Sequence, residues 1–167
     1  MNKKGFTLIE LLAVIVIIAL IGVLIAPNVI NTLESGKESS YKILINNIVT
    51  AAKTYYEECE YGDLSDNTKY GEYACQINNN NINTTLGALA NTGILSVKDT
   101  NDNQKVVKDP RNNNNLTTCP ITITKTKTEE KDENGITSLQ ITYTVEPVKS
   151  TTTSSENNCP TEYGSTN

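Results

Sequence analysis

The hydrophobic and polar positions divide the chain into a long apolar run, an amphipathic stretch and a mostly polar remainder. Every residue from Leu11 to Ala26 is apolar or glycine, and the run reaches back to Phe6 with two polar interruptions. A helix over 6–27 extends roughly 30 Å at about 1.5 Å per residue, which is the thickness of the hydrocarbon core of a bilayer. The pattern therefore predicts a membrane-spanning helix.

The residues that flank the run predict how it is oriented. Residues 1–5 include two lysines and form a short cationic flank. The positive-inside preference places this end in the cytoplasm and everything after Pro27 outside. The end of the run lacks the polar region and small-residue cleavage site of a secretory signal, so we interpret the helix as retained.

Apolar residues continue through 28–59 at steps of three and four, which predicts an amphipathic helix with one apolar stripe. The stripe consists of Ile30, Leu33, Tyr41, Leu44, Ile48, Ala51 or Ala52, and Tyr55. Residues 6–27 and 28–59 are expected to form one long helix. Pro27 lacks an amide donor and therefore favours a kink between Gly22 and Pro27. The stripe is expected to hold a small globular head.

The polar remainder contains alternating segments that predict strands. Ile121 and Ile123 alternate with threonines, and a second alternating run covers 138–145. The charged segment 129–135 between them ends in Asn134-Gly135, a dipeptide typical of hairpin turns. We expect an antiparallel sheet of three or four strands, counting one at residues 106–107.

The rest of the head shows weaker signals. Thr84 or Thr85 is expected to cap a short helix that stops at Gly93. The asparagine tract 78–83 is interpreted as irregular, and the Ser/Thr-rich segment 149–167 as a loose tail that is pinned only if Cys159 is bonded.

Composition excludes several classes of function. The 167 residues carry a net charge of −5 and include no histidine. The acidic balance gives no sign of nucleic-acid binding. Without histidine, the Ser-His-Asp and Cys-His schemes and histidine-containing zinc sites are excluded. Neither a Gly-rich phosphate loop nor a metal-ligand pattern stands out, so we expect no enzyme activity, catalytic residue, cofactor or metal.

The four cysteines predict two disulfides, because an extracytoplasmic domain with a thin core commonly uses them. They are Cys59, Cys75, Cys119 and Cys159, and none forms a Cys-x-x-Cys pair. Three connectivities are possible from sequence alone. Closeness in sequence favours Cys59 with Cys75 and Cys119 with Cys159, while free buried thiols remain the alternative.

Two acidic features suggest specific roles. A carboxylate such as Glu10 inside a membrane span costs about 2.5 to 3.5 kcal/mol and is usually paired. Its own helix offers no cation at the next turn, so its partner is expected on a neighbouring copy, unless Glu10 lies near the interface and reaches water. Asp99, Asn101 and Asp102 or Asn103 have the spacing of a calcium loop, but Gln104 and Pro110 occupy two of its key positions, so a solvated turn is preferred.

The segment Lys3-Lys4-Gly5-Phe6-Thr7-Leu8-Ile9-Glu10-Leu11-Leu12 resembles the type III signal of type IV prepilins and pseudopilins. The resemblance implies cleavage after Gly5 by a prepilin peptidase, methylation of the new amine of Phe6, and a role for Glu10 in joining subunits. Pro27 resembles the family's proline near the end of the apolar stretch. The methylated amine of one copy could then be the partner of Glu10 in the next.

The implied fold is α+β and type IV pilin-like, with a small antiparallel head packed on the distal half of a long N-terminal helix. Its parts are a leader (1–5), a transmembrane assembly helix (6–27), an amphipathic helix (28–59), a head (60–148) and a tail (149–167). The implied location is a single-pass cytoplasmic membrane protein before assembly and a cell-surface filament afterwards.

The implied function is that of a structural pilin, which forms a helical homo-oligomer. Its implied partners are the membrane, the prepilin peptidase, an assembly platform protein and an ATPase. A pseudopilin of a type II secretion or competence machine and a minor tip adhesin share the same N-terminal features. A signal-anchored module with no filament role is the remaining alternative.

Overall fold

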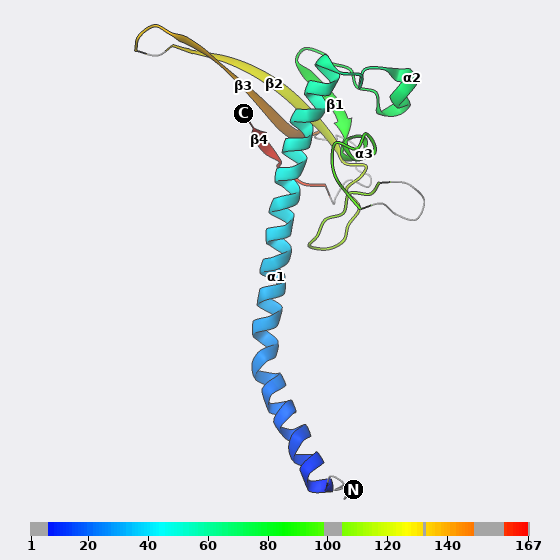
Figure 1. Cartoon of the computed structure of the whole chain (residues 1–167), viewed down its shortest axis with the longest axis vertical. Helices are drawn as coiled ribbons and strands as arrows, with labels where there is room; N and C mark the ends of the chain where they lie inside the picture. The colour runs from blue at the N-terminus through cyan, green and yellow to red at the C-terminus, as the bar shows by residue number, and fades with distance from the viewer. Residues whose placement is uncertain (1–6, 99–104, 132, 149–158, 167) are drawn as a thin grey trace, which may run out of the picture. The chain divides into compact units, whose positions relative to one another are not determined.

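The computed structural model describes residues 7–98, 105–131, 133–148 and 159–166, without the side chains of 24–28. A long N-terminal helix is followed by short helices and a small antiparallel sheet, so the predicted α+β class is observed (Figure 1). The chain divides into two compact units, Met1–Ser39 and Ser40–Asn167. The second half of the long helix therefore belongs to the same unit as the sheet.

Helix α1 spans Leu8–Tyr61 and ends two residues after the predicted boundary. Its backbone is helical through Pro27, so the proline does not end the helix, and the kink stays a prediction. Within the described ranges, no helix is both long and apolar enough to cross a membrane.

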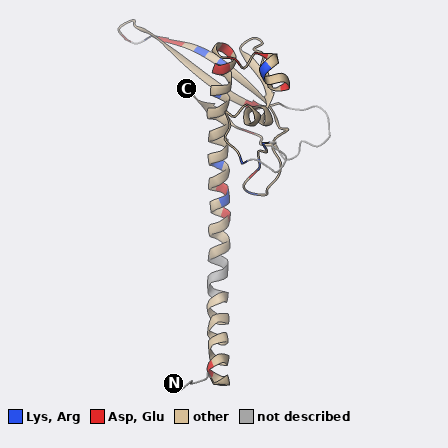
Figure 2. Ribbon diagram, turned by 45° about the vertical axis from the view of Figure 1, so that its right-hand side comes forward, with Lys and Arg blue, Asp and Glu red and all other residues tan. Residues whose placement is uncertain are grey.

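The first part of α1 exposes its apolar side chains. The large apolar residues from Leu8 to Val23 have exposed fractions between 48% at Val16 and 84% at Leu8. Figure 2 shows that charged residues are nearly absent from this part of the helix, with one acidic position close to its start. An apolar surface that continues around a helix is typical of a segment that is covered by other molecules.

The second unit contains a four-stranded antiparallel sheet in the order β1-β2-β3-β4. The strands are β1 (Asn81–Thr85), β2 (Pro120–Lys131), β3 (Thr137–Pro147) and β4 (Gly164–Thr166). The predicted hairpin is confirmed, because β2 pairs with β3 from Ile121 to Lys131, and Gly135 in the connection has a φ of 76°. Residues 129–131 belong to β2 and not to the connection, since they pair with 137–139.

The prediction of a strand at residues 106–107 is wrong. Val107 is fully buried in a loop, where its carbonyl accepts a hydrogen bond from the Leu116 amide at 2.8 Å. The additional strands are β1 and β4. Strand β1 lies partly in the asparagine tract that we interpreted as irregular, because burial of Ile82 and pairing with β2 outweigh the weak strand propensity of asparagine.

The chain end is better anchored than the predicted loose tail. Residues 149–158 lie outside the described ranges, but Cys159 is bonded to Cys119, and Tyr163 is 6% exposed. Strand β4 then pairs with Tyr143–Val145 of β3. The tail was predicted to be pinned only if Cys159 is bonded, and the Cys119–Cys159 disulfide meets this condition.

Three short helices among the described residues complete the head unit. Helix α3 (Leu86–Asn91) confirms the predicted cap, because the hydroxyl of Thr85 accepts a hydrogen bond from the Ala88 amide at 3.2 Å. Gly93 follows with a φ of 85°, a backbone conformation that glycine adopts most readily. Helix α2 (Asn67–Tyr70) and the 3-10 helix η1 (Gly71–Tyr73) lie between α1 and the sheet in sequence.

The core of the head joins the second half of α1 to the sheet. It includes Ile48, Ala52, Tyr55, Tyr56, Ile82, Leu89, Ile121, Ile123, Tyr143 and Val145. Within the predicted stripe, Leu44 packs at the edge of this cluster, whereas Ile30 and Leu33 are 56% and 59% exposed. The part of the stripe that enters the core therefore begins at Leu44.

Candidate functional site

Three reciprocal hydrogen bonds between Thr7 and Glu10 cap the start of α1. The backbone amide of Thr7 donates to Glu10 Oε2 at 2.8 Å, and its hydroxyl donates to the same oxygen at 2.9 Å. The amide of Glu10 donates to Thr7 Oγ1 at 3.4 Å. This arrangement is a capping box, which satisfies amide groups that the first helical turn leaves without partners.

The capping box gives Glu10 hydrogen-bond donors on its own chain, while a cationic partner on a neighbouring copy stays a prediction. Within a single chain, Thr7 already supplies two donors to the carboxylate. The role of Thr7 was not predicted, although Thr-x-x-Glu before an apolar helix is a recognised start signal. Because an ionised carboxylate has about four acceptor sites, Glu10 can keep Thr7 and also accept an ammonium group.

The other predicted residues of this segment are only partly described. Gly5 and Phe6, and the residues proposed for a calcium loop at 99–103, lie outside the described ranges. Gly22 is exposed, and a Cβ added to it would meet nothing within 4 Å. Pro27 has a helical backbone. These positions therefore remain predictions.

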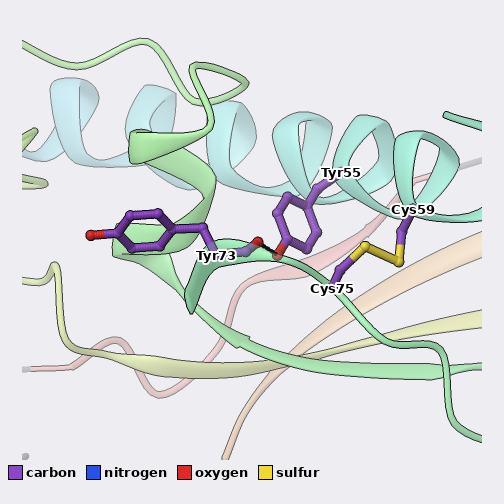
Figure 3. The surroundings of a disulfide bond; sticks show 4 residues. All are labelled: Tyr55, Cys59, Tyr73 and Cys75. Carbon is purple, nitrogen blue, oxygen red and sulfur yellow. Dashed lines mark hydrogen bonds between the residues drawn. A yellow bond between two sulfur atoms is a disulfide. The ribbon is translucent and has the colours of Figure 1, made fainter. Parts of the chain in front are cut away.

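The two disulfides have the pairing that sequence proximity favoured. Cys59 bonds Cys75 and thereby ties the last turns of α1 to the loop after η1 (Figure 3). Beside it, the hydroxyl of Tyr55 donates a hydrogen bond to the carbonyl of Tyr73 at 3.0 Å. Cys119 bonds Cys159, so none of the four cysteines is a free thiol.

A buried lysine joins the same end of α1 to the sheet. Lys125 on β2 is 5% exposed, and its ammonium group pairs with the carboxylate of Glu60. The rings of Tyr56, Tyr61 and Tyr143 lie 5.5 to 5.9 Å from the ammonium nitrogen, within the range of cation–π attraction.

Its surroundings keep Lys125 charged. Burial by itself would lower the pKa of Lys125, but the hydrogen bond to Glu60 and the nearby oxygens of Tyr143 and Tyr61 raise it to about 12. The role of Lys125 was not predicted from the sequence. The alternation of buried positions along β2 could have predicted its burial, because Lys125 follows Ile121 and Ile123 on the inward face of the strand.

A second charged contact fixes the loop around residue 109 to α1. The guanidinium of Arg111 lies 3.3 Å from the ring centre of Tyr41 and donates to the carboxylate of Asp109 at 2.8 Å. Asp109 is 2% exposed. Burial raises the pKa of its carboxyl, but the bonds from Arg111 outweigh this and leave the pKa below its ordinary value. Both charged contacts hold the sheet and its loops to the second half of α1.

Comparison with known proteins adds one finding to this geometry. Residues 1–26 match the family described as the prokaryotic N-terminal methylation motif. No significant match to the chain is found among curated proteins or among solved structures. The matched residues include Gly5, Phe6, Thr7 and Glu10.

Such a motif implies processing by a prepilin peptidase, a membrane-anchored precursor and assembly into a filament with dedicated machinery. The long helix followed by a small antiparallel sheet is consistent with that assignment. The chain therefore carries a type IV prepilin-like signal, which supports a type IV pilin- or pseudopilin-like protein.

Proposed function

We propose that this protein is the structural subunit of a type IV pilus-like filament. It is cleaved after Gly5, methylated at Phe6 and assembled through the apolar first part of α1. The observation that carries the proposal is the methylation motif over residues 1–26. The proposal gives no role in catalysis to the protein and needs no cofactor.

The exposed apolar surface of Leu8–Val23 supports this role. In water such a surface is unfavourable by about 25 cal/mol for each Å². The lipid of the membrane would cover it before assembly, and neighbouring copies would cover it in the filament. Contacts that repeat without closing, as between successive copies, are the kind that build filaments.

Glu10 would set the register of successive subunits. Cleavage after Gly5 creates a new amine on Phe6, and this amine stays cationic when it is methylated. In a staggered bundle it would reach Glu10 of the neighbouring copy, while Thr7 of the same chain continues to donate to that carboxylate. An uncompensated buried charge costs roughly 3 to 5 kcal/mol, so shifted registers would be disfavoured.

The head would lie outside the cytoplasm, packed as in pilins on the distal half of the helix. Its two disulfides support this location, because such bonds persist in oxidising compartments. The cationic residues Lys3 and Lys4 would remain on the cytoplasmic side until the leader is removed. A platform protein and an ATPase would drive assembly.

Shearing filaments from cells that carry a Glu10→Gln variant tests the proposal. We expect the subunit in the sheared fraction to fall at least tenfold, while the membrane fraction retains it. Glu34→Gln is the matched control, because Glu34 is an exposed acid of the same helix outside the motif. Equal recovery of the Glu10→Gln variant and the wild type, or absence of the wild-type protein from sheared filaments, would overturn the proposal.

A further inference from the structure

The connection between β2 and β3 places an asparagine and a glycine at the exposed tip of the hairpin. The ladder between the two strands ends at the pair of Lys131 with Thr137. Residues 133–136 of the connection are all exposed. Figure 1 shows the hairpin extending away from the rest of the head unit. Water therefore reaches Asn134 and Gly135 directly.

Asparagine followed by glycine is a chemically reactive pair. Asparagine is thermolabile because the backbone nitrogen of the next residue can attack its side-chain amide and close a succinimide ring. A side chain on that next residue hinders the attack, and glycine has none. Asn134 is the only asparagine of the sequence that is followed by glycine. The space beside Gly135 is also open, because a Cβ placed there would meet no described atom within 4 Å.

The backbone of the tip favours the same reaction. Gly135 has a φ of 76°, and the conformational freedom of glycine lets its nitrogen approach the side chain of Asn134. Hydrogen bonds of Asn134 within the turn are broken when the loop opens locally, and exposed loop tips open at low free-energy cost. Such bonds therefore set the rate of the reaction and do not remove the site.

Other described asparagines are held in less reactive surroundings. The side-chain nitrogen of Asn91 donates to the carbonyl of Gly87 at 2.9 Å, and the side-chain oxygen of Asn115 accepts from the amide of Thr117 at 2.9 Å. A residue with a branched side chain follows each of these two asparagines. The sequence and the fold therefore both distinguish Asn134.

We propose that Asn134 is a site of spontaneous deamidation in the folded protein. The backbone nitrogen of Gly135 forms a bond to Cγ of Asn134, the bond from Cγ to the side-chain nitrogen breaks, and ammonia leaves with the proton of the Gly135 amide. Water then opens the succinimide. Opening at Cγ gives aspartate, and opening at the backbone carbonyl carbon of Asn134 gives isoaspartate.

Both products change the tip of the hairpin. Each places a new negative charge next to Glu133. Isoaspartate also lengthens the main chain by one CH2, in a hairpin whose register is fixed by its turn. The outermost pairs of the ladder, which end at Lys131 and Thr137, are therefore expected to weaken first.

The reaction itself does not depend on the proposed function, because it needs only the exposed tip and water. Its consequence does rest on that function, since subunits of a surface filament would accumulate the modification with time. Older filaments would then carry a larger modified fraction than newly assembled ones.

Peptide mapping of the purified full chain in detergent tests the proposal. The folded protein is incubated at mildly alkaline pH, which promotes loss of the proton from the attacking nitrogen, and is then reduced and digested with trypsin. The tryptic peptide 132–149 contains Asn134 as its only asparagine. The tryptic peptide 112–125 is the internal control, because it contains four asparagines and none is followed by glycine. Chromatography with mass detection separates the asparagine, aspartate and isoaspartate forms.

Two further samples complete the design. The variant Asn134→Gln retains a side-chain amide but would have to close a larger ring, which forms more slowly. Wild-type protein unfolded in urea shows how the same sequence reacts without the fold. Protein digested before incubation gives the background of the digestion itself.

We expect Asn134 in the folded chain to convert at least tenfold faster than the asparagines of the control peptide, with isoaspartate as well as aspartate among the products. The peptide 132–149 of Asn134→Gln should convert at least tenfold more slowly than that of the wild type.

Conversion of Asn134 only after unfolding in urea would overturn the proposal, because the folded tip would then protect it. Equal conversion in the two peptides, or aspartate without isoaspartate, would also overturn it. A protein that deamidates at Asn134 but is absent from sheared filaments would refute only the proposed function.

Discussion

Removal of the buried pair between Lys125 and Glu60 tests how the end of α1 is held to the sheet. We predict the outcome of a double-mutant cycle with Lys125→Met, Glu60→Gln and the double variant. Methionine retains most of the volume among the three tyrosine rings and removes the charge. Glutamine retains the shape of the carboxylate and removes its charge.

The magnitude follows from the pKa of Lys125. Burial opposes the charged form, but Glu60 and the tyrosines raise the pKa from 10.5 to about 12. Each pKa unit corresponds to about 1.36 kcal/mol, so the charged form is favoured in the folded state by about 2 kcal/mol. The side chain of Glu60 is 27% exposed, and solvent screening reduces the expected coupling to about 1 to 2 kcal/mol.

The sign of the pH dependence is fixed by the direction of this change. A lysine whose pKa is higher in the folded state contributes its full stabilisation below pH 10.5 and loses it as the pH rises through about 12. The cycle is therefore expected to give its full coupling at neutral pH.

The assay is urea unfolding of the full chain at constant detergent concentration, followed by circular dichroism and tyrosine fluorescence. We expect each single variant to lower the free energy of unfolding, and the double variant to lose less than the sum of both by about 1 to 2 kcal/mol. Lys127→Met, on the exposed continuation of the same strand face, should change it by less than about 0.5 kcal/mol. A coupling near zero, or an equal effect of Lys127→Met, would refute the reasoning.

Three further predictions concern the head. Replacing both cysteines of a disulfide by alanine should lower the free energy of unfolding by about 3 kcal/mol for Cys59–Cys75 and by about 4 kcal/mol for Cys119–Cys159, because the bonds close loops of 16 and 40 residues. Equal unfolding midpoints of the wild type with and without reductant would contradict this. Asp109→Asn should destabilise the head at pH 7, and its difference from the wild type in pH-dependent unfolding should shrink as the pH falls below about 4, because the pKa of this carboxyl is lowered and its stabilisation is lost in acid. Gly87→Ala should destabilise by about 1 to 3 kcal/mol in urea unfolding, since a Cβ there would lie 2.9 Å from the backbone oxygen of Thr117; a rise in stability would show that the loop yields.

The sequence predicted those elements that form through contacts between residues close together in the chain. Thr85 caps α3 through its own hydroxyl, and the connection containing Asn134-Gly135 joins two strands with a simple alternation. The cysteine pairing also followed proximity in the chain. In each of these cases the determining partners lie close together in sequence.

Elements that depend on distant partners could not be predicted in the same way. Strand β1 is defined by its pairing with β2 and by burial of Ile82, because its own sequence is mostly asparagine and threonine. Strand β4 depends on the Cys119–Cys159 bond and on β3. At Val107 a strand was predicted and none is present. This apolar residue is buried in a loop, and an apolar residue in the sequence does not distinguish the two cases.

Charged residues at the candidate site have partners that the sequence pattern alone did not show. Glu10 was expected to lack a partner on its own chain because only cations were considered, while Thr7 offers neutral donors at the helix start. Lys125 occupies an inward position that its contact with Glu60 makes acceptable, and the two residues are far apart in sequence.

The central claim concerns the N-terminal signal, and the mass of the protein recovered from the cell surface tests it most directly. We expect the recovered chain to begin at Phe6 and to be heavier than the unmethylated chain by one CH2, because a methyl group replaces one hydrogen of the new amine. Reduction should add four hydrogens, two for each disulfide. Surface protein that retains Met1–Gly5 in cells with an active prepilin peptidase would contradict the account.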